Sequence, residues 1–85
     1  MKVLVYTKNY CPFCVHAKNL FEAKGLSYEE VNLEGQHDKL IDLVNQTQMR
    51  TVPQIFINDK FIGGYSELKA FDDSGELDKL IQQTN

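Results

Sequence analysis

The sequence predicts one mixed α/β domain, a four-stranded sheet with helices on both faces. Apolar runs of strand length alternate with helical patterns in the first half of the chain, and two short strands joined by a turn follow. Strands joined by a helix are parallel with a right-handed crossover, whereas a tight turn joins antiparallel strands. The 85 residues suffice for one domain, which we expect to span residues 1–85.

The first half of the chain predicts two strands and a helix. Val3–Tyr6 is a continuous apolar run, typical of a strand buried on both faces. A helix is expected from Pro12, because proline has no N–H to leave unpaired at the first helical position. Gly25 is a suitable end for this helix, and a second strand follows at about Ser27–Leu33. The apolar face of the helix would carry Phe13, Ala17, Leu20 and Phe21.

The middle of the chain predicts a second helix and a hairpin. The helix covers roughly Asp38–Gln46, with Leu40, Ile41 and Val44 facing inward. Strands at Gln54–Ile57 and Lys60–Ile62 flank the turn signal Asn58-Asp59.

Two short helices are expected at the end of the chain. Gly63-Gly64 ends the last strand, and Ser66 can cap a helix that carries Leu68 and Phe71. Asp73-Ser74-Gly75 interrupts this pattern. A final short helix is marked by Leu77, Leu80 and Ile81.

Composition and charge exclude several classes of function. A net charge of −3 disfavours a nucleic-acid-binding protein, which normally presents a basic face. No apolar run approaches the roughly 20 residues that a membrane span needs, and the N-terminal run Met1–Tyr6 is too short for a signal peptide. We therefore expect a cytoplasmic protein, monomeric by default, that has neither nucleic acid nor a membrane as a partner.

The only two cysteines, Cys11 and Cys14, form a C-x-x-C pair between a predicted strand and a predicted helix. A zinc site needs two more ligands, but His16 follows Cys14 too closely and His37 opens a different element. No metal site is therefore expected. A static disulfide is disfavoured by the cytosolic setting and by the small loop that it would close. The pattern favours a redox-active dithiol.

The two cysteines are expected to have different roles. Cys11 lies where the helix begins, so unpaired N–H groups and the helix dipole favour its thiolate, which is the nucleophilic form. Cys14 is one turn further and more covered, which suits a thiol that resolves a mixed disulfide formed at Cys11. Lys8 adds a positive charge that favours the thiolate.

Three separated segments of the chain resemble the glutaredoxin family, specifically its small bacterial-type members with a C-P-x-C dithiol motif. They are Tyr6–Lys8 with Cys11–Cys14, then Arg50–Ile57, then Ile62–Leu68. The resemblance implies a thioredoxin fold and a glutathione-dependent enzyme that reduces protein disulfides and glutathione mixed disulfides. Glutathione would be a co-substrate, and no bound cofactor is implied.

The resemblance also implies partners and a cellular role. Disulfide-containing or glutathionylated proteins would be the substrates, with ribonucleotide reductase suggested as one of them. Electron transport and cell redox homeostasis would be the processes served.

The family's glutathione site can be placed on matching residues. Pro53 would follow a cis peptide bond and leave the backbone of Val52 free to pair with the tripeptide. Gly64 and Ser66 would offer helix N-terminal N–H groups to the γ-glutamyl carboxylate, and Glu67 would meet its ammonium group. Lys8 and Arg50 would face the glycyl carboxylate. The full expected set is Lys8, Phe13, Arg50, Thr51, Val52, Pro53, Gly64, Tyr65, Ser66 and Glu67.

The chain departs from the family pattern at a few positions near this site. Phe13 replaces a common tyrosine, so ring packing is retained without the hydroxyl. Gln48-Met49 replaces a pair that usually contains glycine, and Tyr65 leaves no third cysteine near the site. His16 is open to two interpretations, a surface helix residue or a group that tunes the pH response.

Two other functions remain as alternatives to the glutaredoxin activity. One is a small redoxin that is reduced by thioredoxin reductase instead of glutathione; the glutathione-type segments disfavour it. The other is an iron–sulfur carrier in which two chains share a cluster through Cys11 and bound glutathione. Pro12 disfavours that carrier, because cluster-binding relatives usually have a less constrained residue there.

Overall fold

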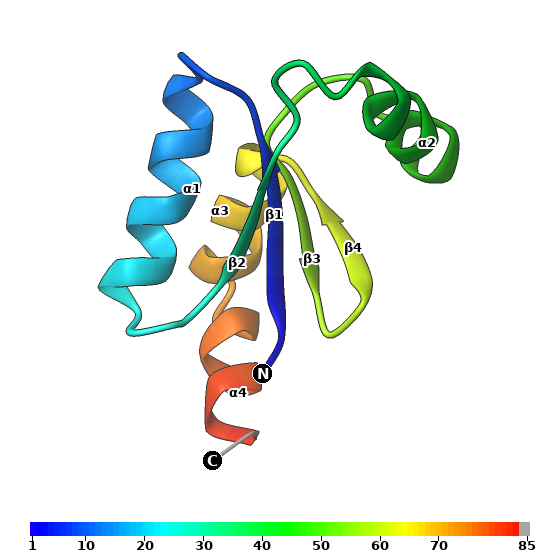
Figure 1. The fold of residues 1–85 in the computed structure, drawn as a ribbon. Helices are drawn as coiled ribbons and strands as arrows, with labels where there is room; N and C mark the ends of the chain where they lie inside the picture. Colours follow the sequence, from blue (N-terminus) through cyan, green and yellow to red (C-terminus); the bar gives the residue numbers. More distant parts are fainter. Residues whose placement is uncertain (84–85) are drawn as a thin grey trace.

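A mixed four-stranded sheet forms the centre of the computed structural model, which describes residues 1–83 (Figure 1). The strands lie in the order β2-β1-β3-β4; β1 is parallel to β2 and antiparallel to β3, and β3 is antiparallel to β4. The predicted fold class is confirmed. Residues 84 and 85 of the expected domain lie outside the described part. The elements are β1 (Val3–Thr7), α1 (Pro12–Ala23), β2 (Glu29–Asn32), α2 (His37–Thr47), β3 (Gln54–Ile57), β4 (Lys60–Gly63), α3 (Tyr65–Asp73) and α4 (Glu76–Gln83).

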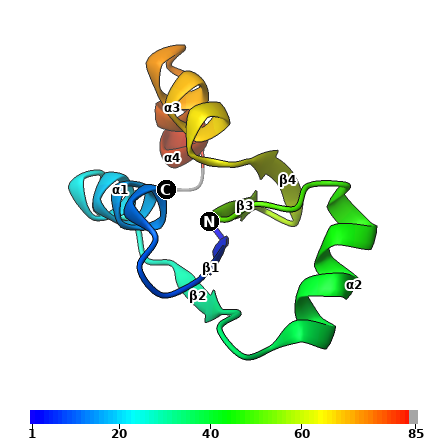
Figure 2. The same cartoon turned by 90° about the horizontal axis from the view of Figure 1, so that it is seen from above.

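The helices cover both faces of the sheet, as Figure 2 shows from above. Helices α1, α3 and α4 lie on one face and α2 lies on the other. The main core fills the space between the sheet and the first group, because alternate residues of β1 and β3 point that way. This core consists of Val3, Val5, Ala17, Phe21, Ile55, Ile57, Leu68 and Leu77. It fixes the starts of α1 and α3 relative to the end of β1 and the start of β3, which lie at the same edge of the sheet.

Helix α2 covers the second face of the sheet with a different set of inward residues than the sequence suggested. Its one buried residue is Leu43, whereas Ile41, predicted to point inward, is 44% exposed. The inward face therefore comprises Leu40, Leu43 and Val44, which are three and four residues apart. The sheet beneath carries half-buried aromatic rings, with Tyr6 and Phe56 5.9 Å apart between ring centroids.

Three further local predictions are corrected by the structure. The helical pattern places Phe13 on the apolar face of the first helix, but its side chain is 60% exposed because the first turn of α1 extends past the core. Ser66 is not the cap of α3; the N-cap is Gly64, and Ser66 lies inside the helix. The second strand is shorter than predicted and covers only Glu29–Asn32. Within residues 1–83, the structure has no helix that is long and apolar enough to cross a membrane.

Candidate active site at the Cys11–Cys14 disulfide

Cys11 and Cys14 form a disulfide at the N-terminus of α1. Cys11 is the N-cap residue, with extended backbone angles, and Pro12 is the first helical residue. The Sγ atom of Cys11 accepts a hydrogen bond from the backbone N–H of Cys14 at 3.2 Å. One of the unpaired N–H groups of the first turn is therefore aimed at this sulfur, which is the arrangement that stabilises a thiolate.

The two sulfurs differ in their access to solvent. Cys14 is buried, with 2% of its surface exposed, while Cys11 is only half-buried. An incoming thiol or disulfide therefore reaches Cys11 first. Three large hydrophobic residues close to Cys11 in the sequence are exposed: Tyr10, Phe13 and Val15 have exposed fractions of 102%, 60% and 49%.

The loop before β3 lies opposite the disulfide. The Val52–Pro53 peptide bond is cis, as the resemblance implied. The carbonyl oxygen of Val52 is 3.8 Å from Sγ of Cys11, so the backbone of this loop borders the reactive sulfur. Pro53 itself is buried and half-buried Val52 lies beside it.

A pocket of about 380 Å³ opens beside this loop, between the first turn of α1 and the first turn of α3. It brings together eight of the ten residues predicted to bind glutathione, together with Met49. Within residues 1–83, the predicted residues Lys8 and Arg50 are not among those that line it; Arg50 borders a separate hollow at α2. The eight are Phe13, Thr51, Val52, Pro53, Gly64, Tyr65, Ser66 and Glu67.

The first turn of α3 is arranged differently from what the sequence predicted. The carboxylate of Glu67 turns back and accepts a hydrogen bond from the N–H of Gly64 at 2.7 Å, so this N–H is occupied. The N–H groups of Tyr65 and Ser66 are at the first two helical positions and have no intrahelical acceptor. They are the donors that α3 offers to an anion in the pocket.

An aromatic cluster links the starts of the two helices. The rings of Phe13 and Tyr65 are stacked, with centroids 6.1 Å apart and planes 25° apart. The His16 ring lies 5.6 Å from Tyr65 and 6.0 Å from Phe13. The cluster forms one side of the pocket through Phe13 and Tyr65. The sequence pointed to each of these residues separately, but their contact depends on the packing of α3 beside α1.

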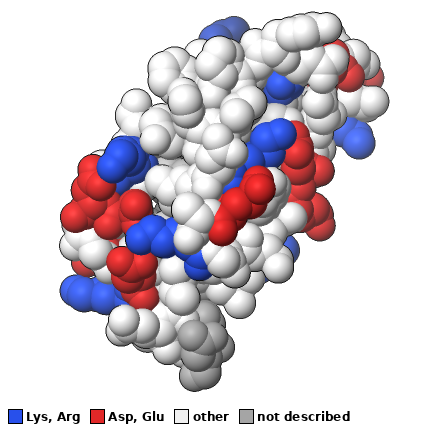
Figure 3. All heavy atoms as spheres, turned by 90° about the vertical axis from the view of Figure 1, so that its left-hand side faces the viewer, with Lys and Arg blue, Asp and Glu red and all other residues white. Residues whose placement is uncertain are grey.

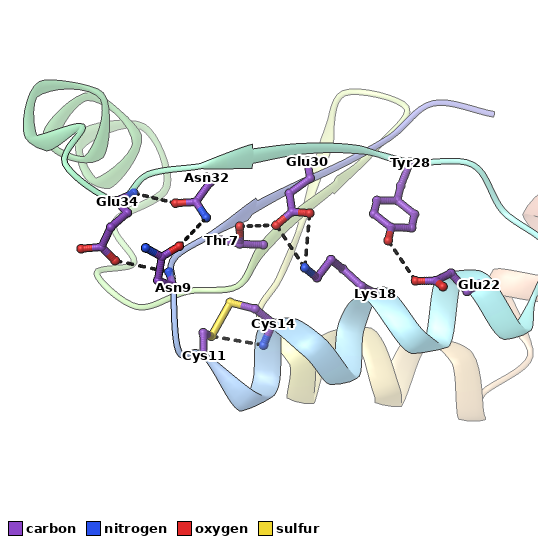
Figure 4. A network of polar contacts seen from close by, with 10 residues as sticks. All are labelled: Thr7, Asn9, Cys11, Cys14, Lys18, Glu22, Tyr28, Glu30, Asn32 and Glu34. Carbon is purple, nitrogen blue, oxygen red and sulfur yellow. Dashed lines mark hydrogen bonds and ion pairs between the residues drawn. A yellow bond between two sulfur atoms is a disulfide. The ribbon is translucent and has the colours of Figure 1, made fainter.

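A polar network joins β1, β2 and α1 near the disulfide (Figure 4). The buried hydroxyl of Thr7 donates to Oε2 of Glu30 at 2.7 Å, and the ammonium group of Lys18 is 3.2 Å from the same oxygen. The Thr7 hydrogen bond, assisted by Lys18, holds the pKa of Glu30 below its ordinary value against the opposing effect of burial. This network ties the end of β1, which leads into the cysteine loop, to its neighbours.

Charges are mixed in sign on the side of the molecule where α1 lies. Figure 3 shows basic and acidic side chains interspersed over the middle and lower part of that face, with mostly uncharged atoms toward the upper end. In the part of the chain that the structure describes, no group of three or more His, Cys, Asp or Glu side chains is placed to hold a metal ion. The polar groups that line the pocket beside the disulfide are the side chains of Thr51, Ser66 and Glu67 together with backbone groups of the loop and of the α3 N-terminus.

A half-buried N-cap cysteine, a buried partner one turn away and an adjoining pocket define the chain as a thiol-disulfide redox protein. The glutaredoxin family model matches residues 3–62. The chain belongs to the glutaredoxin family, as the motif resemblance indicated.

Individual relatives agree with the family assignment. Glutaredoxin 3 of Escherichia coli (strain K12) is 41% identical over 80 residues, which cover 94% of this chain and 96% of the relative. Glutaredoxin-C6 of Oryza sativa subsp. japonica is 42% identical over 84 residues, covering 95% of this chain and 75% of the relative.

Solved structures confirm the thioredoxin fold that the resemblance implied. The crystal structure of a wheat glutaredoxin superimposes with a TM-score of 0.89 at 38% identity, covering 95% of this chain and 79% of the other. A buckwheat glutaredoxin-glutathione complex superimposes with a TM-score of 0.87 at 32% identity, covering 95% and 76%.

Proposed function

We propose that this protein is a glutathione-dependent thiol-disulfide oxidoreductase that reduces protein disulfides and glutathione mixed disulfides. The observation that carries the proposal is the N-cap position of Cys11, whose sulfur accepts the N–H of Cys14 and borders the pocket loop at Val52. Buried Cys14 is the resolving thiol. The glutathione complex of the buckwheat relative supports the identity of the reductant.

With a protein disulfide, the reduced enzyme acts in two exchange steps. The thiolate of Cys11 attacks one substrate sulfur, forms a mixed disulfide and releases the other substrate sulfur as a thiolate, which takes up a proton. Cys14 then loses its proton and attacks Sγ of Cys11, which releases the second substrate thiolate. The enzyme is left oxidised, with the Cys11–Cys14 disulfide that the structure contains.

Two molecules of glutathione then restore the dithiol. The first attacks Sγ of Cys11, the more exposed sulfur, so that a glutathionyl disulfide forms on Cys11 and the Cys14 thiolate leaves. The second attacks the glutathione sulfur of this mixed disulfide, releasing oxidised glutathione and the Cys11 thiolate. A glutathionylated substrate needs only Cys11, because its attack gives the same glutathionyl intermediate directly.

The pocket offers a distinct contact to each part of glutathione. The exposed backbone edge at Val52 pairs with the tripeptide main chain, and this places the glutathione sulfur near Cys11. The N–H groups of Tyr65 and Ser66 bind the γ-glutamyl carboxylate. Glu67 lines the same end of the pocket, where its carboxylate would exchange its bond to Gly64 for an ion pair with the ammonium group. Lys8 and Arg50 stay as proposed partners of the glycyl carboxylate, outside the pocket lining.

The proposed roles of the two cysteines are tested with single variants in a coupled assay with glutathione and glutathione reductase. Cys11→Ser should abolish turnover of both a glutathionylated peptide and a protein disulfide. Cys14→Ser should retain turnover of the glutathionylated peptide and lose that of the protein disulfide. Substantial activity in Cys11→Ser would show that the nucleophile is assigned wrongly. Activity with thioredoxin reductase but not with glutathione would show that thioredoxin reductase, and not glutathione, reduces this protein.

We further propose a cytoplasmic monomer that serves electron transport and cell redox homeostasis, without nucleic-acid or membrane partners. Disulfide-containing and glutathionylated proteins, ribonucleotide reductase among them, are the proposed substrates. The negative net charge and the mixed-sign surface support the absence of a nucleic-acid partner. Gel filtration with light scattering tests the oligomeric state.

A further inference from the structure

We propose that Gln54 and Thr47 are positioning residues that set the width of the glutathione groove, an inference that rests on the function proposed above. Gln54 begins β3 and has no exposed surface. It carries two amide hydrogens and an amide oxygen into the interior, where each of these groups needs a partner. Thr47 is the last residue of α2.

The partners of Gln54 are backbone atoms of the pocket loop. Its Nε2 donates to the carbonyl oxygens of Met49 at 2.7 Å and Thr51 at 3.0 Å. Its Oε1 accepts from the Thr47 hydroxyl at 2.8 Å, and the hydroxyl oxygen in turn accepts from the N–H of Met49 at 3.2 Å. The two side chains therefore hold the loop at three backbone atoms, with both amide hydrogens used.

This loop determines the distance across the groove. It leads directly into Val52 and Pro53, and its Met49 side chain reaches across to the N-cap of α3. A methyl group added at Gly64 would lie 2.9 Å from Cε of Met49, so the two sides already meet there without free space. Anchoring Met49 and Thr51 thus fixes the spacing between the backbone edge at Val52 and the first turn of α3.

That spacing matters because the two ends of the groove bind different parts of one ligand. The tripeptide main chain pairs with Val52, and its γ-glutamyl carboxylate reaches the N–H groups of Tyr65 and Ser66. A loop that is free to shift loses one contact when it makes the other. Neither Gln54 nor Thr47 lines the pocket, so both act through Met49 and Thr51.

The experiment uses the full chain with Gln54→Leu, Thr47→Val and Thr47→Ser, and Gln46→Leu as a matched control at an exposed amide that borders a different hollow. The assay measures KM and kcat for a glutathionylated peptide. The rate at which iodoacetamide alkylates Cys11 in the reduced protein is followed against pH. This rate reports on the reactivity of the Cys11 thiolate and does not require glutathione to bind in the groove.

We expect KM to rise about tenfold in Gln54→Leu and in Thr47→Val, the size of effect from losing one good hydrogen-bonded contact to the ligand. The kcat and the Cys11 alkylation profile should stay within about twofold of wild type. Thr47→Ser keeps the hydroxyl and should restore the wild-type KM, and Gln46→Leu should not differ from wild type. Thr47 is only half-buried, so its two variants keep the test valid if Gln54→Leu fails to fold.

An unchanged KM in Thr47→Val would overturn the proposal, as would a KM in Thr47→Ser as high as in Thr47→Val. A shift of the alkylation profile in step with KM would show that the network acts on Cys11 instead of the groove. Any of these results would leave the proposed function intact, provided that the wild type turns over with glutathione in the same assay. A wild type without glutathione-dependent turnover would overturn both.

Discussion

Replacing Glu67 should separate its hydrogen bond from its charge. Its carboxylate accepts the N–H of Gly64 at 2.7 Å in the first turn of α3. Such a capping contact contributes about 1 kcal/mol, and the charge near the helix N-terminus adds about 0.3–1 kcal/mol. Two effects reduce the loss. The Glu67 side chain is exposed, so water can replace part of the hydrogen bond and screens part of the charge interaction, and alanine has a higher helix propensity than glutamate. We therefore expect Glu67→Ala to lose about 1 kcal/mol, which lowers Tm by roughly 4–8 °C in a domain of this size.

Glu67→Gln keeps the acceptor oxygen and removes only the charge, so its Tm should fall by less than half as much. Asp38→Ala is the control for the charge at a helix N-terminus. Asp38 lies in the first turn of α2, and the N-cap residue of that helix, Gln36, makes no side-chain cap hydrogen bond. Thermal unfolding followed by circular dichroism measures the three variants. Equal Tm losses in Glu67→Ala and Glu67→Gln would refute the hydrogen-bond argument. A KM for glutathione that rises in both Glu67 variants would support the ion pair with the γ-glutamyl ammonium.

Three other perturbations test the fold and the surroundings of the site. Because the folded-state pKa of Glu30 is lowered, its stabilisation is present above the ordinary carboxyl pKa and is lost as pH falls through the lowered value. Glu30→Gln should therefore lower Tm near neutral pH and have no effect in acid, and a Tm difference independent of pH would contradict this. Leu68→Ala removes a fully buried side chain and should cost about 2–5 kcal/mol in urea unfolding, against less than about 0.5 kcal/mol for Ile41→Ala at an exposed position. Tyr10→Asn suits the positive φ of 54° and removes an exposed ring beside Cys11. If the exposed ring contacts protein substrates, the variant should raise KM for a protein disulfide several-fold and leave KM for a glutathionylated tripeptide unchanged. Equal changes for the two substrates would contradict such a contact.

Periodicity and turn residues were enough to predict the order of strands and helices, but not which face each helix turns inward. In α2, the sets Leu40, Ile41, Val44 and Leu40, Leu43, Val44 both fit a helical period. Only the position of α2 over the sheet selects Leu43, since neither set is more apolar than the other. Phe13 was misplaced for a related reason: its helical position is apolar, but the core ends below it.

The sequence motifs identified the site residues whose role depends only on their neighbours in the chain, such as Cys11 at the start of a helix. Gly64 and Glu67 also had a readable signal, because glycine is accepted at the N-cap and a glutamate three residues later can accept its N–H; the more familiar cap residue Ser66 obscured it. Gln54 offered a weaker one, an amide at the start of an apolar strand. Its partners could not be predicted, because Thr47 and Met49 meet it only when the end of α2 turns back onto β3.

The starts of two helices converge on the pocket, and the sequence treats them differently. The first turn of α1 contains no acidic residue, so its N–H groups and dipole act on the sulfur of Cys11 without competition. The first turn of α3 contains Glu67, which already occupies one N–H group and cancels part of the positive potential. The stacked rings of Phe13 and Tyr65 hold these two helix starts together. It follows that the Cys11 thiolate is stabilised whenever the enzyme is reduced. In the proposed binding mode, the γ-glutamyl carboxylate of glutathione binds where the Glu67 carboxylate already balances part of the charge. Such a site favours a reactive sulfur together with a ligand that must leave after each turnover.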